Sequence, residues 1–295
     1  MTFLTEQPVF LTALIVLLLI IFQLYQNNRL KVSRYIIESS KIPSGMDGFT
    51  LCHLSDLHSK RFGKDNRRLL EKIDEIQPDI VVITGDMMNN RNDDGRVFLD
   101  LLPHLTKYRC YYVTGNHEQF TAYWDPAFLP KYLEKIRNAG VVVLNNEKLV
   151  IKKGSEQIRL YGLQTDLKYY RNMRDTKFSK VEFTEKNLTD LLGECSERCF
   201  NLLLTHNPLH FQAYADWGAD LVLCGHVHGG VIRLPGVGGL LSPERVFFPE
   251  YSEGIYTKNN TRMIVSRGLG NSTINLRVFN RPEIVVAELK RTSIG

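Results

Sequence analysis

Apolar and polar residues along this chain fall into blocks that predict one long helix followed by a series of short strands and helices. The first block, residues 9–25, reads VFLTALIVLLLIIFQLY and carries no charged residue. As a helix it would rise roughly 26 Å, close to the thickness of the hydrocarbon layer of a bilayer. A block that is apolar on every face favours a membrane helix over the core helix of a globular domain.

A cleaved signal peptide is the main alternative for this block. No Lys or Arg precedes it, no small-residue cleavage signature follows it, and its apolar core is long for a signal. We therefore expect a permanent transmembrane anchor within residues 1–28. Basic residues gather just after it, beginning at Arg29 and Lys31, whereas only Glu6 is charged before it. Because basic flanks stay in the cytoplasm, a single-pass topology with the large C-terminal part of the chain in the cytoplasm is expected.

After the anchor, a polar connector is expected at residues 29–45, with one candidate strand at 32–37. Strands are predicted at residues 49–54, 80–84, 110–113, 141–144, 158–163, 202–205, 221–224, 254–256, 262–266 and 283–289. Helices are predicted at residues 65–77, 97–105, 130–139 and 183–195. Strands that are apolar throughout and separated by helices indicate sheets buried on both faces. We expect one α/β domain over residues 46–295.

Composition and charge narrow the classes of function. Hydrophobic residues make up 43% of the chain and charged residues 23%, which is typical of a globular protein. The net charge of +5 comes without a second block of Lys and Arg, which argues against nucleic acid as a partner. The five cysteines cannot all pair within one chain, and no CxxC pair is present. A reducing compartment is therefore expected, and a thiolate metal site is not.

Five of the predicted strands end in polar groups that can bind metal ions. These groups are Asp56 with His58, Asp86, Asn116 with His117 and Glu118, His206, and His226 with His228. Since the carboxyl ends of strands in α/β sheets converge on one crevice, we expect these side chains to meet. Residues two apart on an extended segment project to the same side, so each Asp-x-His or His-x-His pair would reach one site. Glycines beside Asp86, Asn116 and His226 would allow a close approach of the backbone.

Each piece alone is weak evidence, because Gly-Asp and Gly-Asn are common turn dipeptides and a lone His-x-His is usually a surface feature. The ordered series is specific, and it uses five of the eight histidines. The other three, His53, His104 and His210, are expected to be structural or surface residues. Carboxylate, imidazole and amide ligands suit divalent ions such as Mn, Fe or Zn.

The series Asp56-x-His58, Gly85-Asp86, Gly115-Asn116-His117-Glu118, His206 and Gly225-His226-x-His228 resembles the signature of the calcineurin-like metallophosphoesterase superfamily. The anchor, the opening SDLH and the late SRGLG and NRPEI segments resemble its membrane-anchored bacterial phosphodiesterase branch. The resemblance implies a four-layer α/β/β/α sandwich. It also implies hydrolysis of phosphodiester, phosphomonoester or pyrophosphate bonds by a hydroxide that bridges two divalent metal ions, with manganese favoured.

The resemblance also implies roles for individual residues. One metal would be bound by Asp56, His58 and His228 and the other by Asn116, His206 and His226, with Asp86 bridging both. His117 would not bind metal but would stabilise the phosphoryl charge and protonate the leaving oxygen. Asn89 departs from the protein-phosphatase branch, where an Asp at this place orients the catalytic His. This departure argues against a phosphoprotein substrate.

Two segments beside the expected site are candidates for shaping the substrate. Residues 120–128 and 229–251 follow His117 and His228 and are rich in aromatic or apolar residues. On a chain tied to a bilayer they favour a lipid-linked phosphodiester or a nucleotide-activated glycolipid; the alternative is that these side chains only pack the loops. Candidate phosphate contacts, chosen by position alone, are Arg61, Arg91 and Arg233.

Two other functions stay open on the sequence. A nuclease on the same fold is one, although no added domain or basic groove is visible. A catalytically silent metal-binding scaffold at the membrane is the other. It is disfavoured because every ligand position and His117 are kept.

Overall fold

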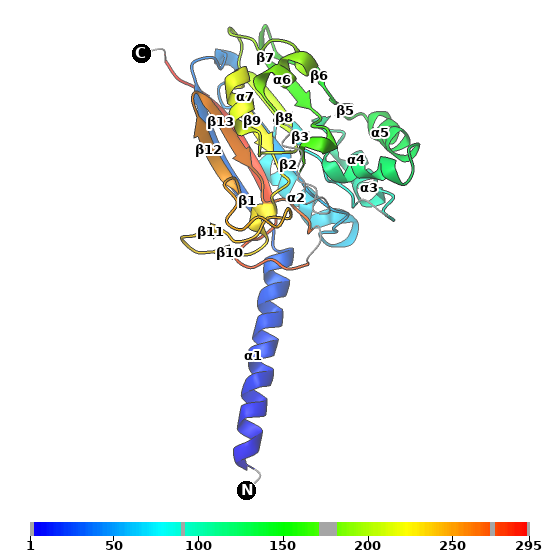
Figure 1. Ribbon diagram of the computed structural model, residues 1–295, viewed down its shortest axis with the longest axis vertical. Coiled ribbons are helices and arrows are strands. Elements are labelled where there is room, and N and C mark those ends of the chain that lie inside the picture. The colour runs from blue at the N-terminus through cyan, green and yellow to red at the C-terminus, as the bar shows by residue number, and fades with distance from the viewer. Residues whose placement is uncertain (1–2, 90–91, 171–181, 272–274, 294–295) are drawn as a thin grey trace.

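A long helix, α1 (Phe3–Asn28), leaves one end of the domain and projects away from it (Figure 1). The computed structural model describes residues 3–89, 92–170, 182–271 and 275–293. Within these residues, one helical stretch, Val9–Asn28, is long and apolar enough to cross a membrane. Its side chains are exposed from Val9 to Ile21, as they would be in a helix surrounded by lipid.

The domain is built on two six-stranded sheets. The first has the order β1 (Lys31–Ser39), β14 (Glu283–Arg291), β2 (Thr50–Leu54), β3 (Ile80–Ile83), β4 (Arg109–Tyr112), β5 (Val142–Val143). The second has the order β12 (Gly254–Lys258), β13 (Thr261–Val265), β9 (Leu221–Cys224), β8 (Asn201–Thr205), β7 (Glu156–Leu163), β6 (Glu147–Lys153). A small hairpin of β10 (Arg233–Leu234) and β11 (Gly238–Gly239) lies outside both sheets.

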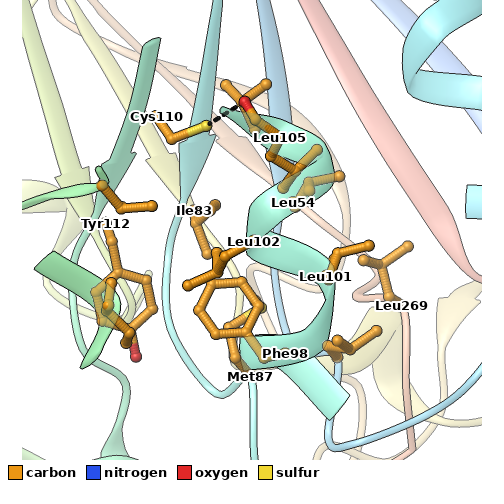
Figure 2. Packing of buried hydrophobic residues seen from close by; sticks show 14 of the residues in the cluster. Leu54, Ile83, Met87, Phe98, Leu101, Leu102, Leu105, Cys110, Tyr112 and Leu269 are labelled. Atoms are coloured by element: carbon orange, nitrogen blue, oxygen red, sulfur yellow. Dashed lines mark hydrogen bonds between the residues drawn. The ribbon is translucent and has the colours of Figure 1, made fainter. Parts of the chain in front are cut away.

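Helices cover the outer faces of the two sheets. The first sheet carries α2 (Arg67–Ile76), α3 (Arg96–Leu105) and α5 (Phe128–Asn138), and the second carries α6 (Glu185–Leu192) and α7 (Phe211–Trp217). Figure 2 shows Phe98, Leu101 and Leu102 of α3 packed against the first sheet. A third cluster of apolar residues fills the space between the sheets. The expected four-layer α/β/β/α sandwich is therefore confirmed.

The strands are apolar throughout because both of their faces are buried. In β3, Val81 and Ile83 pack beneath the helices, whereas Ile80 and Val82 face the second sheet. Successive side chains of a strand point to opposite faces, so burial on both sides requires an apolar residue at every position. This constraint explains why the sequence predicted these strands to within one or two residues.

The segment at residues 29–45 is part of the sheet rather than a free connector. The candidate strand at 32–37 is β1, whose nine residues pair in parallel with all of β14. Ile37 of β1 is buried between the two sheets. The boundary expected at residue 46 therefore cuts off one strand of the domain. Helix α7 was not predicted, because its seven residues are too few for a clear helical period.

A soluble fragment is expected to need β1. A fragment of residues 46–295 should melt at least about 10 °C below a fragment of residues 29–295, because it loses the β1–β14 pairing and the burial of Ile37. The exposed edge of β14 should also make it aggregate. Circular dichroism melting and size-exclusion chromatography of the two fragments test this. Equal melting temperatures and monodisperse elution of both would show that β1 is dispensable.

Candidate metal centre

The seven expected ligands come from strand ends in both sheets. Asp56 and His58 follow β2, Asp86 follows β3 and Asn116 follows β4, all in the first sheet; His206 follows β8, and His226 and His228 follow β9, in the second. Every one of them is buried. Three groups have potential ligand atoms within 4.8 Å of one another: Asp56, His58 and His228; Asp86, His206 and His226; and His58, Asp86 and His117. The structure thus brings six of the seven expected ligands, and His117, together where the two sheets meet.

The first group pairs two imidazoles with a carboxylate. His58 Nε2 lies 3.0 Å from His228 Nε2, and His228 Nε2 lies 3.3 Å from Asp56 Oδ1. Burial lowers the pKa of both histidines to about 3, so both rings are neutral near pH 7. Two neutral ring nitrogens that face each other beside a carboxylate suit a cation that takes both lone pairs.

The second group is centred on Asp86 and His206. His206 Nε2 lies 3.1 Å from Asp86 Oδ2, and its Nδ1 donates a hydrogen bond of 2.6 Å to the Thr84 carbonyl. Burial lowers the pKa of His206, but the charge of Asp86 outweighs it and raises this pKa to about 10. The proton on Nε2 must therefore leave before that nitrogen can bind a metal. In His226, Nε2 contacts Glu244 Oε1 at 2.8 Å, which leaves Nδ1 for a metal.

Asn116 offers a further ligand atom. Its side-chain Oδ1 is buried and has no hydrogen-bond partner among the described residues. A buried amide oxygen without a partner is costly unless it serves another purpose. Together with the two carboxylates and four imidazoles, it completes a set of hard and borderline donors that fits two divalent cations.

The backbone around the site adopts an unusual conformation. Five of the seven expected ligands have φ between 46° and 73°: Asp56, His58, Asp86, His226 and His228. Side chains other than glycine rarely adopt this left-handed region, and they do so mainly where surrounding structure enforces it. The expectation that the Asp-x-His and His-x-His pairs lie on extended segments is therefore wrong. Sharp turns, rather than strand geometry, aim these side chains at one another.

The glycines beside the ligands allow two pairs of loops to touch. A Cβ atom on Gly115 would lie 2.1 Å from Asp86 Oδ1, and one on Gly225 would lie 2.2 Å from Asp56 Oδ2. Gly85 has φ of 84°, and a Cβ there would meet the Gly115 backbone. These contacts leave no room for a side chain, which is the close approach predicted from the sequence.

His117 lies at the edge of the cluster. Its side chain is 20% exposed, its Nε2 is 4.0 Å from Asp86 Oδ2, and its ring meets the His58 ring edge to face at 4.6 Å. Its Nδ1 has no hydrogen-bond partner within the described part of the chain. Asn89 instead bonds to Asp93 and to the carbonyl of His58. The position that orients the catalytic His in protein phosphatases therefore supports the His58 loop here.

Glu118 has a role that the sequence reasoning missed. Its carboxylate is fully buried and accepts the backbone N–H groups of Asp86 (2.9 Å), Met87 (2.7 Å) and Gly115 (2.9 Å). Burial and the charge of Asp86 raise its pKa to about 7. Glu118 thus ties the loop after β3 to the loop after β4. Its place directly after Asn116-His117 was the signal that could have revealed it.

Arg277 and Asn280, near the C-terminus, bond to the backbone of the segments around the candidate ligands. Arg277 is fully buried and donates to the carbonyls of Arg267, Gly268 and Gly270, while the Gly270 N–H bonds to the Asp56 carbonyl at 2.6 Å. Asn280 donates to the His228 carbonyl at 2.7 Å. The SRGLG and NRPEI segments contain these residues or their partners, but spacing alone did not show their role.

Two of the three candidate phosphate contacts are paired with carboxylates of the domain. Arg61 is about half exposed and lies 3.9 Å from Asp100. Arg233 is held by Glu253 at 2.7 Å and by the Gly229 carbonyl at 2.9 Å. Arg91 lies outside the described residues.

The three histidines expected to be structural or surface residues, His53, His104 and His210, lie outside the three groups of candidate metal ligands described above. His53 is buried in β2 and bonds to Thr84 Oγ1 at 2.7 Å. His104 is exposed, and His210 is half-buried beside Phe183. None of the three belongs to a potential metal-binding group in the part of the chain that the structure describes.

Comparison with known proteins agrees with this geometry. The model of the calcineurin-like phosphoesterase family matches residues 49–230. The chain is 29% identical over 272 residues to the uncharacterized metallophosphoesterase YkuE of Bacillus subtilis (strain 168), covering 90% of this chain and 87% of that protein. It is 27% identical to Phosphodiesterase YaeI of Escherichia coli (strain K12), covering 82% of each. It is also 27% identical to a transmembrane protein with metallophosphoesterase domain of Danio rerio, covering 88% of this chain and 57% of that protein.

The chain therefore belongs to the calcineurin-like phosphoesterase family. It is a metal-dependent phosphoester hydrolase, as expected from the sequence. The N-terminal apolar helix and the transmembrane relative indicate association with a membrane.

Replacing Glu118 tests its structural role. Glu118→Gln turns one acceptor oxygen into an NH₂ donor, so at least one buried N–H loses its acceptor. We expect the free energy of unfolding to fall by about 2 kcal/mol and the melting temperature of the detergent-solubilised chain by about 4–8 °C. The exposed Glu134→Gln on α5 serves as the control. A Glu118→Gln chain that melts with the control and binds as much metal would contradict this role.

Proposed function

We propose that this protein is a two-metal phosphodiesterase anchored in a membrane by α1. The observation that carries the proposal is the convergence of six buried donor side chains, from strand ends of both sheets, on neighbouring groups of metal-ligand geometry. The relative YaeI is named a phosphodiesterase, which supports a diester rather than a monoester as the substrate.

The proposed ligands divide between two ions. Asp56, His58 and His228 would bind one ion, Asn116, His206 and His226 the other, and Asp86 would contact both. Asp86 Oδ2 supports the bridging role because it lies within 4.0 Å of ring nitrogens of His58 and His206. Manganese is the favoured metal. Iron and zinc remain alternatives, because oxygen and imidazole donors suit all three metals.

When bound, the two cations would supply a lowered pKa for a water nucleophile and positive charge for the phosphoryl oxygens. The chain's own residues complete the chemistry. His117 stands at the partly exposed edge of the cluster, where a substrate can reach its Nε2. From there it would hold the phosphoryl group and donate a proton to the leaving oxygen. The Asp86 carboxylate accepts a hydrogen bond of 2.8 Å from the backbone N–H of His117, which fixes the position of His117.

A pocket beside His226 supports an amphiphilic substrate. It has a volume of about 220 Å³, and its lining includes Leu209, Val227, Val246 and Pro249. Such apolar walls next to a phosphoester site suit a substrate with an apolar part. We propose a lipid-linked phosphodiester or a nucleotide-activated glycolipid, with the catalytic domain on the cytoplasmic side because basic residues follow α1.

Hydrolysis of bis(p-nitrophenyl) phosphate by the full-length chain in detergent tests the reaction. We expect turnover that needs Mn²⁺ and falls by at least about 100-fold in Asp86→Asn, which loses the charge shared by two cations. The exposed Asp190→Asn on α6 should keep full activity. Metal binding without turnover of any diester or monoester would favour the scaffold function, and cleavage of DNA in preference to these esters would favour a nuclease.

His117→Gln tests proton donation. We expect kcat to fall about 10²–10⁴-fold for an alkyl leaving group, which needs protonation, and much less for p-nitrophenolate, which leaves unprotonated. Metal content should not change, because His117 is not a proposed ligand. Equal losses for both leaving groups would exclude a general-acid role.

A further inference from the structure

The last turn of α1 is bonded to the domain rather than tethered loosely. Lys60 Nζ donates to the Asn27 carbonyl at 2.5 Å, and Asn271 Nδ2 donates to Asn27 Oδ1 at 3.0 Å. Arg281 Nη2 donates to the Leu30 carbonyl at 2.8 Å. Several contacts from different segments hold a helix end in one orientation, so the end of the domain beside α1 faces the membrane that α1 would enter.

Part of the domain reaches alongside the apolar region of α1. Phe279 packs edge to face against Phe22, with ring centroids 5.5 Å apart. Phe22 lies six residues before the end of the helix, or roughly 9 Å along its axis. One turn closer to the domain along α1, the guanidinium groups of Arg29 and Arg281 lie 6.0 Å and 5.6 Å from the Tyr25 ring. Aromatic rings with basic side chains around them are typical of the membrane–water interface.

The β10–β11 loop continues this surface. Ile232 bridges to Val278, and the Arg233 N–H donates to the Val278 carbonyl at 2.9 Å. The loop lies at the end of the domain from which α1 leaves (Figure 1). Leu234 and Val237 are exposed apolar residues of this hairpin, and Phe247 and Phe248 are exposed in the segment that follows it, where Phe247 bridges to Leu241 and the Phe248 N–H donates to the Leu240 carbonyl at 3.0 Å. Phe279 adds a fifth.

Clustering sets these five residues apart from scattered exposed apolar residues. Single exposed apolar side chains are common on soluble proteins, but a group on adjoining segments marks a binding surface. Phe247 is 67% exposed and Phe248 is 58% exposed. The segment that carries Phe247 and Phe248 also supplies Val246 and Pro249 to the pocket beside His226. The exposed apolar surface therefore adjoins the catalytic site.

We propose that Leu234, Val237, Phe247, Phe248 and Phe279 form a second membrane contact that seats the catalytic domain on the bilayer. The inference rests on the proposed anchoring by α1 and does not depend on the reaction catalysed. Its occupant is the bilayer into which α1 inserts, because Phe279 contacts a residue within the apolar helix itself. The pocket beside His226 would then open next to the lipid surface.

Fluorescence quenching by lipids brominated in their acyl chains tests this contact. Full-length protein is placed in phosphatidylcholine–phosphatidylglycerol vesicles on a Trp124→Phe background, whose remaining Trp217 is buried. Phe248→Trp and, separately, Val237→Trp report on the loop. Leu191→Trp is the matched control, because it is exposed on α6, at the opposite end of the domain (Figure 1).

We expect brominated lipid to reduce the fluorescence of both loop variants about twofold more than that of Leu191→Trp, because indole settles at the interface. Vesicle flotation separates the outcomes. Protein that floats with vesicles but shows no extra quenching overturns the second contact and leaves the anchor standing. If such protein is also dimeric by mass photometry, the surface joins two copies instead. Protein that fails to float overturns the anchor and the contact together, while diester hydrolysis remains a separate measurement.

Discussion

The carboxylate of Asp86 lies where the two sheets meet, and the site is arranged around it. Its Oδ2 is 3.1 Å from His206 Nε2 of the second sheet and 3.8 Å from His58 Nε2 of the first. A carboxylate that is only 2% exposed needs charges and hydrogen bonds in place of the water it has lost. Neighbouring imidazoles and the His117 N–H provide part of this replacement. Two cations would provide the remaining stabilisation of the carboxylate. Such cations would explain why these donors lie together in a site from which water is excluded.

Holding these side chains together requires a strained backbone. The left-handed turns at the ligands persist because apolar clusters on both sides of each sheet keep the strands in place. Buried Glu118 and Arg277 then fix the loops by bonding to their backbone groups. The same C-terminal segment contacts the end of α1 through Phe279 and Arg281. The loops that carry the candidate ligands and helix α1 are thus joined through one short stretch of chain.

The strands and the candidate metal ligands could be predicted because both leave local signals, whereas the four-layer arrangement followed from the family resemblance. A strand buried on both faces must be apolar, and Asp86 or His226 follows its strand within a few residues. The roles of Glu118, Arg277 and Asn280 were not predictable from spacing, since they act through backbone hydrogen bonds to distant segments. The membership of β1 in the sheet was also missed, because its partner β14 lies at the other end of the chain.

The electron paramagnetic resonance spectrum of the full-length chain loaded with Mn²⁺ tests the shared site most directly. Two Mn²⁺ ions that contact one carboxylate should give an exchange-coupled spectrum, and Asp86→Asn should replace it with the signal of isolated ions. The exposed Asp190→Asn should leave the coupled spectrum unchanged. A spectrum of isolated Mn²⁺ in the unmodified chain, at saturating metal and with one ion bound per chain, would contradict a two-metal centre built around Asp86.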